Sequence, residues 1–409
     1  MNLRIIQMSK NKILIPFILI CVFIVSIPKV EAGENKASKP DVDLLTEKIE
    51  VDTLETVGDT PDVLPWNSLE TYNDILSDGT ILRLAVVLSD IYSKKDMEFM
   101  RGLLYGIDQA GLPKESISLK VINGEIPADS LEYELEYPHI ILSTNEKEVP
   151  RSLIEFADEN DVWLVNVFDP KSNDYLTHPT LYQLFTPSNI FSTNAANYFK
   201  DNFSDNILVI IGTPDPSDMI LQDLILSWPE EYLYVISKEE LPTFLMDEGS
   251  NYLFYPSTTS HDEVKSILED TLKLMVDNPI TGVRIIGRPN WVMYGNFSNM
   301  LSNLEVFIPV KCYFDSTSPM SKRFLSGYKS KFGQTPLKSY PVYAAMGYDV
   351  ARHFLPKIII NDITDHRIES DKLQIFMDFA KESQGGYYNK GAYILHFEPW
   401  GTMQKELIH

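Results

Sequence analysis

The chain has 409 residues, 58 of them acidic and 35 basic, which gives a formal net charge of −23. Nucleic acids and anionic lipids are bound through lysine and arginine contacts to phosphate, so this balance argues against both as partners. The two cysteines, at positions 21 and 312, exclude a disulfide framework, and the 44% of hydrophobic residues is ordinary for a globular protein.

The first 32 residues have the three parts of a secretory signal peptide. An apolar run at 13–25 follows a basic segment that contains Arg4, Lys10 and Lys12, and small side chains stand at positions 30 and 32. The pattern predicts cleavage between Ala32 and Gly33 and a periplasmic protein of formal charge −26, because four basic residues and one acidic residue are removed. Two alternatives are open. The run stays as an anchor, although a span needs roughly 20 apolar residues, or Cys21 carries a lipid, although the branched Ile20 precedes it.

Residues 33–79 have the composition of an acidic leader. They contain twelve acidic residues against three lysines, and their apolar residues are mostly single. Such a segment cannot bury enough surface to fold alone, so we predict that it is largely disordered. Helical spacing of apolar residues predicts one short helix at 66–76 that docks on the body.

From residue 81 the chain alternates between apolar runs of strand length and amphipathic helical patterns. Strands are predicted at 81–88, 118–122, 138–142, 162–167, 207–211, 232–236, 252–255, 283–286 and 306–310, and helices at 96–110, 150–159, 217–228, 261–276 and 321–332. Continuous apolar strands between helices indicate a parallel sheet that is covered on both faces. So many strands predict an α/β fold with two doubly wound, Rossmann-like lobes.

Five segments in the right order resemble type I periplasmic binding proteins, the group that includes the leucine-binding, branched-chain amino-acid receptors of ABC transporters. They are 98–106, 181–188, 252–259, 324–351 with its Gly347-Tyr348-Asp349 motif, and 391–397. The resemblance covers about residues 80–405. It implies a lobe one of 80–187 plus 316–388 and a lobe two of 188–315 plus 389–409, joined by crossover hinge strands near 186–188 and 315–318. In amino-acid receptors a glycine follows the third strand, whereas here Ser143 follows Leu142, so the resemblance does not single out an amino acid.

The carboxyl ends of parallel strands are where ligands bind in open α/β sheets. This rule nominates polar and aromatic residues that follow the predicted strands, with Tyr294 as a further wall of the cleft: Ser89, Ser143, Thr144, Asn166, Phe168, Thr213, Ser257, Thr258 and Tyr294. Hydroxyl and amide side chains also cap helices at such positions, so capping and ligand contact are both open for each residue.

Patterns of catalytic or metal-binding residues are scarce. The chain has no Gly-x-Ser-x-Gly, Walker or His-Glu-x-x-His motif, and His261-Asp262-Glu263 fits the first turn of a helix better than a metal site. Cys312 beside a strand is predicted to be a small buried hydrophobe. We therefore expect no enzyme, no catalytic residue, no metal and no cofactor.

Two functional hypotheses follow from the resemblance. The first is an exported solute-binding protein that closes its hinge on a small polar ligand, such as an amino acid, a peptide or a cell-wall fragment, and serves an inner-membrane or envelope partner. The alternative is a cell-envelope scaffold or regulator that keeps the fold without a working pocket. An open cleft with a bound ligand would favour the first hypothesis, and a cleft filled by side chains would favour the second.

Overall fold

The computed structural model describes residues 2–6, 81–110, 112, 116–124, 127, 130–244, 249–277, 282–359 and 372–409. The predicted acidic leader at 33–79, with its helix at 66–76, lies outside these residues. So do the apolar run at 13–25 and the predicted cleavage site after Ala32. No helix within the described ranges is both long enough and apolar enough to cross a membrane.

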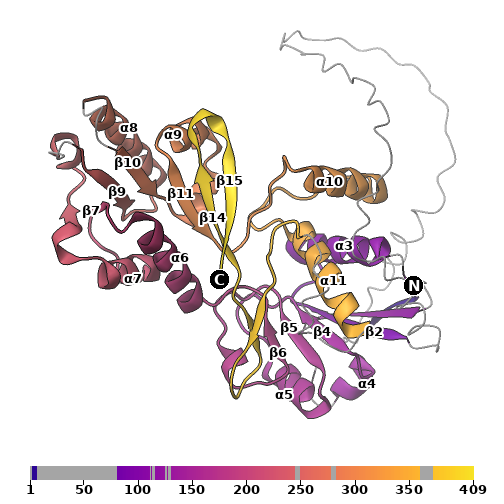
Figure 1. Cartoon of the computed structure of the whole chain (residues 1–409). Coiled ribbons are helices and arrows are strands. Elements are labelled where there is room, and N and C mark those ends of the chain that lie inside the picture. Colours follow the sequence, from indigo (N-terminus) through magenta and orange to yellow (C-terminus); the bar gives the residue numbers. More distant parts are fainter. Residues whose placement is uncertain are drawn as a thin grey trace, which may run out of the picture. The chain divides into compact units, whose positions relative to one another are not determined.

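Lobe one is built on a sheet of eight strands in the order β1-β3-β2-β4-β5-β6-β13-β12 (Figure 1). The strands are β1 (Asn2–Ile6), β2 (Leu82–Leu88), β3 (Ile117–Asn123), β4 (Ile140–Ser143), β5 (Trp163–Asn166), β6 (Leu181–Gln183), β12 (Phe379–Lys381) and β13 (Tyr387–Asn389). All neighbouring pairs are parallel except β12 with β13.

Lobe two is built on a sheet of seven strands in the order β15-β14-β11-β10-β9-β7-β8. The strands are β7 (Ile207–Ile211), β8 (Leu233–Ile236), β9 (Asn251–Pro256), β10 (Gly282–Ile286), β11 (Val306–Val310), β14 (Ala392–Phe397) and β15 (Met403–Ile408). The strands from β7 to β11 are parallel to one another, β14 pairs antiparallel with β11, and β15 pairs antiparallel with β14.

Five adjacent strands in each sheet follow one topology. Numbered within each lobe, they run 2-1-3-4-5, as β3-β2-β4-β5-β6 in lobe one and β8-β7-β9-β10-β11 in lobe two. In doubly wound sheets, ligands bind outside the carboxyl ends of the strands where this order reverses. The reversal lies between β2 and β4 in lobe one and between β7 and β9 in lobe two.

Helices cover both faces of each sheet. In lobe one these are α3 (Lys94–Gln109), α4 (Leu131–Leu135), α5 (Arg151–Asn160), α10 (Pro319–Phe332) and α11 (Tyr343–Ile359), and in lobe two α6 (Ser188–Phe203), α7 (Met219–Ser227), α8 (His261–Asp277) and α9 (Ser298–Asn303). Short 3-10 helices lie at 174–176, 230–232, 241–243, 289–293, 295–297 and 399–401. Each sheet therefore has two apolar cores, one on each face, and the predicted class of two doubly wound α/β lobes is confirmed.

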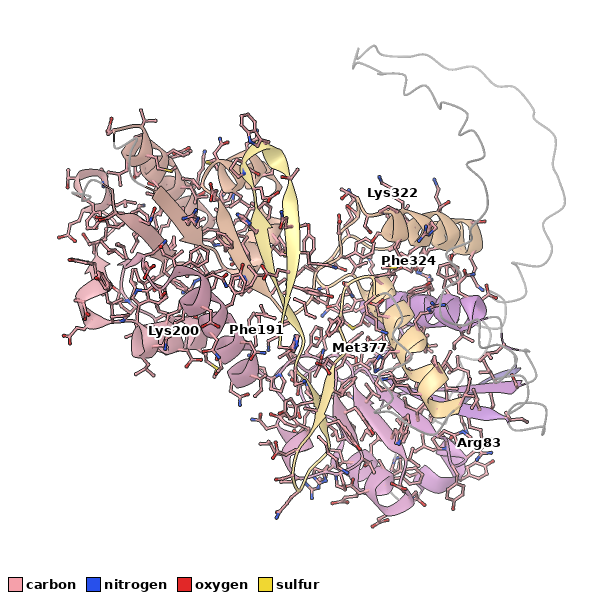
Figure 2. All side chains as sticks on the ribbon, in the orientation of Figure 1. Arg83, Phe191, Lys200, Lys322, Phe324 and Met377 are labelled. Atoms are coloured by element: carbon pink, nitrogen blue, oxygen red, sulfur yellow. The ribbon has the colours of Figure 1, made fainter. Side chains whose placement is uncertain are left out.

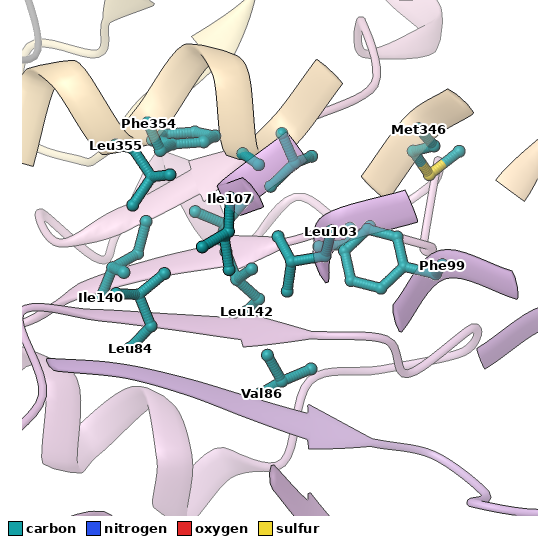
Figure 3. Close-up of a cluster of buried hydrophobic side chains, with 14 of the residues drawn as sticks. Leu84, Val86, Phe99, Leu103, Ile107, Ile140, Leu142, Met346, Phe354 and Leu355 are labelled. Atoms are coloured by element: carbon teal, nitrogen blue, oxygen red, sulfur yellow. The ribbon is translucent and has the colours of Figure 1, made fainter. Parts of the chain in front are cut away.

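Lobe one buries its main core between β2, β4 and the helix pair α3 and α11. Figure 3 shows strand side chains facing helix side chains across this layer: Leu84, Val86, Ile140 and Leu142 against Phe99, Leu103, Ile107, Met346, Phe354 and Leu355. The two helices approach closely because glycines face backbone. A Cβ on Gly102 of α3 would overlap the Ala344 carbonyl, and one on Gly347 of α11 would overlap the Phe99 carbonyl.

All nine predicted strands are present, each within two residues of its predicted ends. The five helices predicted from residue 81 onward are also present, and their ends follow local capping. The Ser318 side chain accepts from the Ser321 N–H, so α10 starts two residues earlier than predicted, and Gly333 ends it with a φ of 72°. The residue limits of the two lobes stay a proposal.

The chain passes between the two sheets three times, at 184–187, 311–318 and 390–391. The first and the third crossover are tied to each other. The Thr186 hydroxyl donates to the Gly391 carbonyl at 2.5 Å, and the Asn389 amide donates to the Leu184 carbonyl at 3.0 Å. Buried side-chain bonds therefore join the first crossover to the third.

Candidate functional site

A cavity of about 420 Å³ lies beside the crossovers and is lined by residues from both lobes. Most of its wall is apolar: Phe168, Pro170, Phe185, Tyr340, Tyr343 and Met346 come from lobe one, and Phe191 and Pro289 from lobe two. Phe191 is in the first turn of α6 (Figure 2). A volume of this size and a wall of this kind are typical of small-molecule sites.

The cavity residues come from segments that follow the carboxyl ends of strands. Glu146 follows β4, Phe168 follows β5, Pro289 follows β10 and Lys311 follows β11 directly. The chain has to leave the apolar sheet layer at these ends, and its next residues are then free to face the space outside the sheet. The topology thus gathers them although they are up to 165 positions apart in the sequence.

Two oppositely charged residues on the cavity wall form an ion pair. The Lys95 ammonium lies 2.5 Å from the Glu146 carboxylate, and both side chains are nearly half exposed. The hydrogen bond to Glu146 raises the pKa of Lys95, so the lysine stays charged. Exposed ion pairs contribute at most about 1 kcal/mol to stability. The pair matters for the cavity mainly because the two charges cancel and leave no net charge at this part of the wall.

Lys311 is the other cation on the wall, and it is much less well paired. Its ammonium donates to the Ser188 hydroxyl at 3.1 Å and lies 5.6 Å from the centre of the Phe191 ring. Burial lowers the pKa of Lys311 to about 8, with Lys171 acting in the same direction and Cys312 in the opposite one. Within the described part of the chain, no carboxylate lies within ion-pair distance of this ammonium.

The neighbouring Cys312 is buried, with 3% of its surface exposed, as predicted. Burial raises the pKa of its thiol to about 12, so the thiol is not a nucleophile at neutral pH. The Tyr340 hydroxyl donates to the Cys312 carbonyl at 3.1 Å. This bond fixes one aromatic wall of the cavity to the second crossover.

No protein-family model matches the chain, and no curated protein matches it. The chain does match solved structures. A branched-chain amino acid ABC transporter periplasmic ligand-binding protein from Burkholderia xenovorans LB400 superposes with a TM-score of 0.51 at 9% identity, over 79% of this chain and 94% of that chain. A protein from Rhodospirillum rubrum, assigned to the branched-chain amino acid ABC transporters, gives a TM-score of 0.55 at 12% identity, over 80% and 99% of the two chains. The chain has the type I periplasmic binding protein fold.

In this periplasmic binding protein fold, the predicted residue Ser143 ends the strand β4 at the reversal point of lobe one, and the predicted Thr144 follows it. Both are fully buried. The Thr144 hydroxyl accepts from the Ser89 N–H at 3.0 Å, and the Ser143 hydroxyl accepts from the Asn145 amide at 3.1 Å. Their hydroxyls are thus used within the protein, and neither residue lines the cavity.

Asn166 and Phe168, also predicted, belong to one turn after β5. The buried Asn166 amide donates to Gln183 at 2.9 Å and to the Asp169 carbonyl at 3.3 Å. Phe168 lines the cavity, and its ring packs 5.1 Å from that of Tyr343. Asn166 therefore shapes the turn, while Phe168 faces the cavity.

The predicted residues of lobe two lie at the carboxyl edge of its sheet but do not line this cavity. Three of them are engaged locally. The Ser257 hydroxyl donates to the Thr213 carbonyl at 2.7 Å, the Thr258 hydroxyl to Glu263 at 2.5 Å, and the Tyr294 hydroxyl to the Thr259 carbonyl at 3.2 Å. Ligand contact by these residues, and by Ser89, Ser143, Thr144 and Asn166, remains a proposal.

Sequence reasoning missed the cavity residues Lys311 and Phe191. A signal for Lys311 was present, because it is the single charged residue directly after the five buried residues of β11. Phe191 gave no such signal, since an aromatic residue in the first turn of a helix is ordinarily part of a core.

Proposed function

We propose that this protein is an exported solute-binding protein that holds a small ligand in the cavity beside its crossovers. The observation that carries the proposal is the cavity itself, which combines residues from both lobes at the carboxyl ends of their strands. A ligand held there contacts both lobes at once. Closure of the lobes around it then stabilises the bound form and commits the ligand to the site.

The crossovers are the segments where such a closure would bend. The first at 184–187 and the second at 311–318 both contribute to the cavity wall, through Phe185, Lys311 and Cys312. A ligand therefore touches the hinge as well as the lobes. The closed form is then available for recognition by an inner-membrane transporter, which is the partner we propose.

Blocking the cavity tests the proposal. In a thermal-shift screen of amino acids, short peptides, sugars, organic acids and peptidoglycan fragments, at least one compound should raise the melting temperature of the wild-type protein. The variant Pro170→Trp places an indole in the cavity and should weaken binding of that compound by about tenfold or more.

Pro229→Trp is the matched control. Pro229 is exposed and precedes β8, so it lies at the amino end of a strand, whereas the cavity lies at the carboxyl ends. It should bind as the wild type does. Equal binding by Pro170→Trp would exclude this cavity. A screen without any binding compound would favour the alternative of an envelope scaffold.

Export gives a separate prediction. N-terminal sequencing of the natively produced protein should give Gly33 as the first residue. Cleavage there removes β1, which is the outermost strand of its sheet and pairs only with β3 within the described residues. A chain that starts at Gly33 should therefore still fold cooperatively. A native start at Met1, or a shortened chain that does not fold, would be evidence against the signal peptide.

A further inference from the structure

The cavity next to the crossovers has an unbalanced charge. Of its three charged residues, Lys95 and Glu146 pair with each other at 2.5 Å, which leaves the Lys311 ammonium without a counter-ion among the described residues. Lys311 is partly buried, and a charge that is withdrawn from water costs free energy unless a group of opposite charge or several hydrogen bonds compensate it. Among the described residues one hydrogen-bond acceptor contacts this ammonium, the Ser188 hydroxyl.

The position of Lys311 strengthens the positive potential at this end of the cavity. Ser188 is the first residue of the 16-residue helix α6, and Pro187 before it provides no side-chain cap. The helix N-terminus carries a partial positive charge and free N–H groups. The Lys311 ammonium therefore lies beside a second centre of positive potential, the N-terminus of α6. An anion placed there would be attracted by the ammonium and by the helix.

The rest of the wall is suited to an apolar body. Phe168, Phe185, Phe191, Tyr343 and Met346 line it, and the first three of these are at most 8% exposed. The carboxylate of Asp96, next to Lys95 in the sequence, does not line the cavity, and its Oδ2 accepts from the Ser89 hydroxyl at 3.0 Å. The described wall thus offers no unpaired carboxylate for an ammonium group of a ligand.

We propose that the ligand is a small organic anion without an ammonium group, whose carboxylate pairs with Lys311 and whose aromatic or branched apolar body packs against the phenylalanine wall. This inference rests on the proposed function of the cavity, and it adds the chemical class of the ligand. A zwitterionic amino acid fits less well, because its ammonium group would lose water without gaining a partner.

Compounds that differ only in their charged group test the class. The probes are 3-phenylpropanoate, 3-phenylpropanamide and L-phenylalanine, with 4-methylpentanoate, its amide and L-leucine as an aliphatic set. Calorimetry on the full-length protein should give the tightest binding for the two carboxylates. Tighter or equal binding of the amides or the amino acids would overturn the anion proposal while leaving the cavity as a binding site.

Variants of the lysine test its role. Lys311→Met removes the charge at similar length and should weaken binding of the carboxylate by about 10- to 100-fold, the range expected for a charged hydrogen bond. Lys311→Arg should retain most of the affinity. Lys322→Met, an exposed site on α10 that is labelled in Figure 2, makes the same change in net charge and should have no effect. Unchanged binding by a folded Lys311→Met protein would overturn the assignment.

The pH profile gives a readout that loss of packing would not produce. The group that titrates is Lys311, with Cys312, Lys171 and the first turn of α6 beside it. Because only the charged lysine pairs with the anion and its pKa is about 8, affinity should fall about tenfold from pH 7 to pH 9. In Lys311→Arg it should be flat, since arginine stays charged. A flat wild-type profile would contradict the pairing. If no probe and no screened compound binds wild type at either pH, the proposed function fails as well.

Discussion

Gly102→Ala should lower the free energy of unfolding by about 3 kcal/mol, and the melting temperature by about 6–12 °C, as measured by denaturant and thermal unfolding. The reason is the close approach of α3 and α11, where a Cβ at position 102 would overlap the Ala344 carbonyl. Backbone cannot move aside as a flexible side chain can. The two helices would have to separate, and the core beneath them would lose its packing.

The contact is reciprocal, which provides an internal check. A Cβ at Gly347 would overlap the Phe99 carbonyl from the other side. Gly347→Ala should therefore cost a similar amount. The double variant should cost less than the sum of both, because one separation of the helices relieves both overlaps. Gly295→Ala is the control, since no atom lies within 4 Å of its added Cβ. Wild-type melting of Gly102→Ala would show that the helices are not held this closely.

Strands that are buried on both faces were predictable from the sequence, and amphipathic ones were not. The segments that became β7 and β11 are continuous apolar runs, which are typical of strands in a doubly covered sheet. Strand β15 has three consecutive exposed polar residues, 404–406, between partly buried ones, and β12 and β13 have three residues each. Such short or mixed segments leave no periodic signal, because their pairing is set by tertiary contacts. The strand β1 fell in a segment that was predicted to be removed.

The edge of the sheet at which the candidate site lies was predictable, whereas most of the residues of the site were not. The rule for α/β sheets places ligands at the carboxyl ends of strands, and Phe168 was found in this way. Hydroxyl residues such as Thr144 and Ser257 stand at the same ends but bond to neighbouring backbone groups. Sequence cannot separate these two uses, since both need a short polar side chain. Lys311 was overlooked because a lysine after a strand is usually solvated, and its burial depends on α6, which comes from another part of the chain.

Asp349→Ala should lower the free energy of unfolding by about 3–5 kcal/mol, which is the cost of leaving buried N–H groups without acceptors. The fully buried carboxylate of Asp349 on α11 accepts from the N–H groups of Leu373, Gln374 and Ile375, at 2.7, 2.8 and 3.1 Å. It therefore fixes the segment that leads to the third crossover. Asp378→Ala is the control, because the Asp378 carboxylate forms a partly exposed ion pair with Lys390. It should cost less than about 1 kcal/mol.

The same carboxyl group should also leave a signature in the pH dependence of stability. Burial raises the pKa of Asp349 to about 6 against the three hydrogen bonds, which act in the opposite direction. In the unfolded chain the pKa is about 4. Between these values the folded state binds more protons than the unfolded one, so the contribution of this group to stability falls as the pH rises from about 4 to about 6, and is constant above. Asp349→Asn does not titrate, so the difference in unfolding free energy between wild type and this variant should shrink over that window. A difference that stays constant from pH 4 to pH 7 would show that the three N–H donors offset the burial of the carboxylate, and a difference that grows with pH would show that they outweigh it.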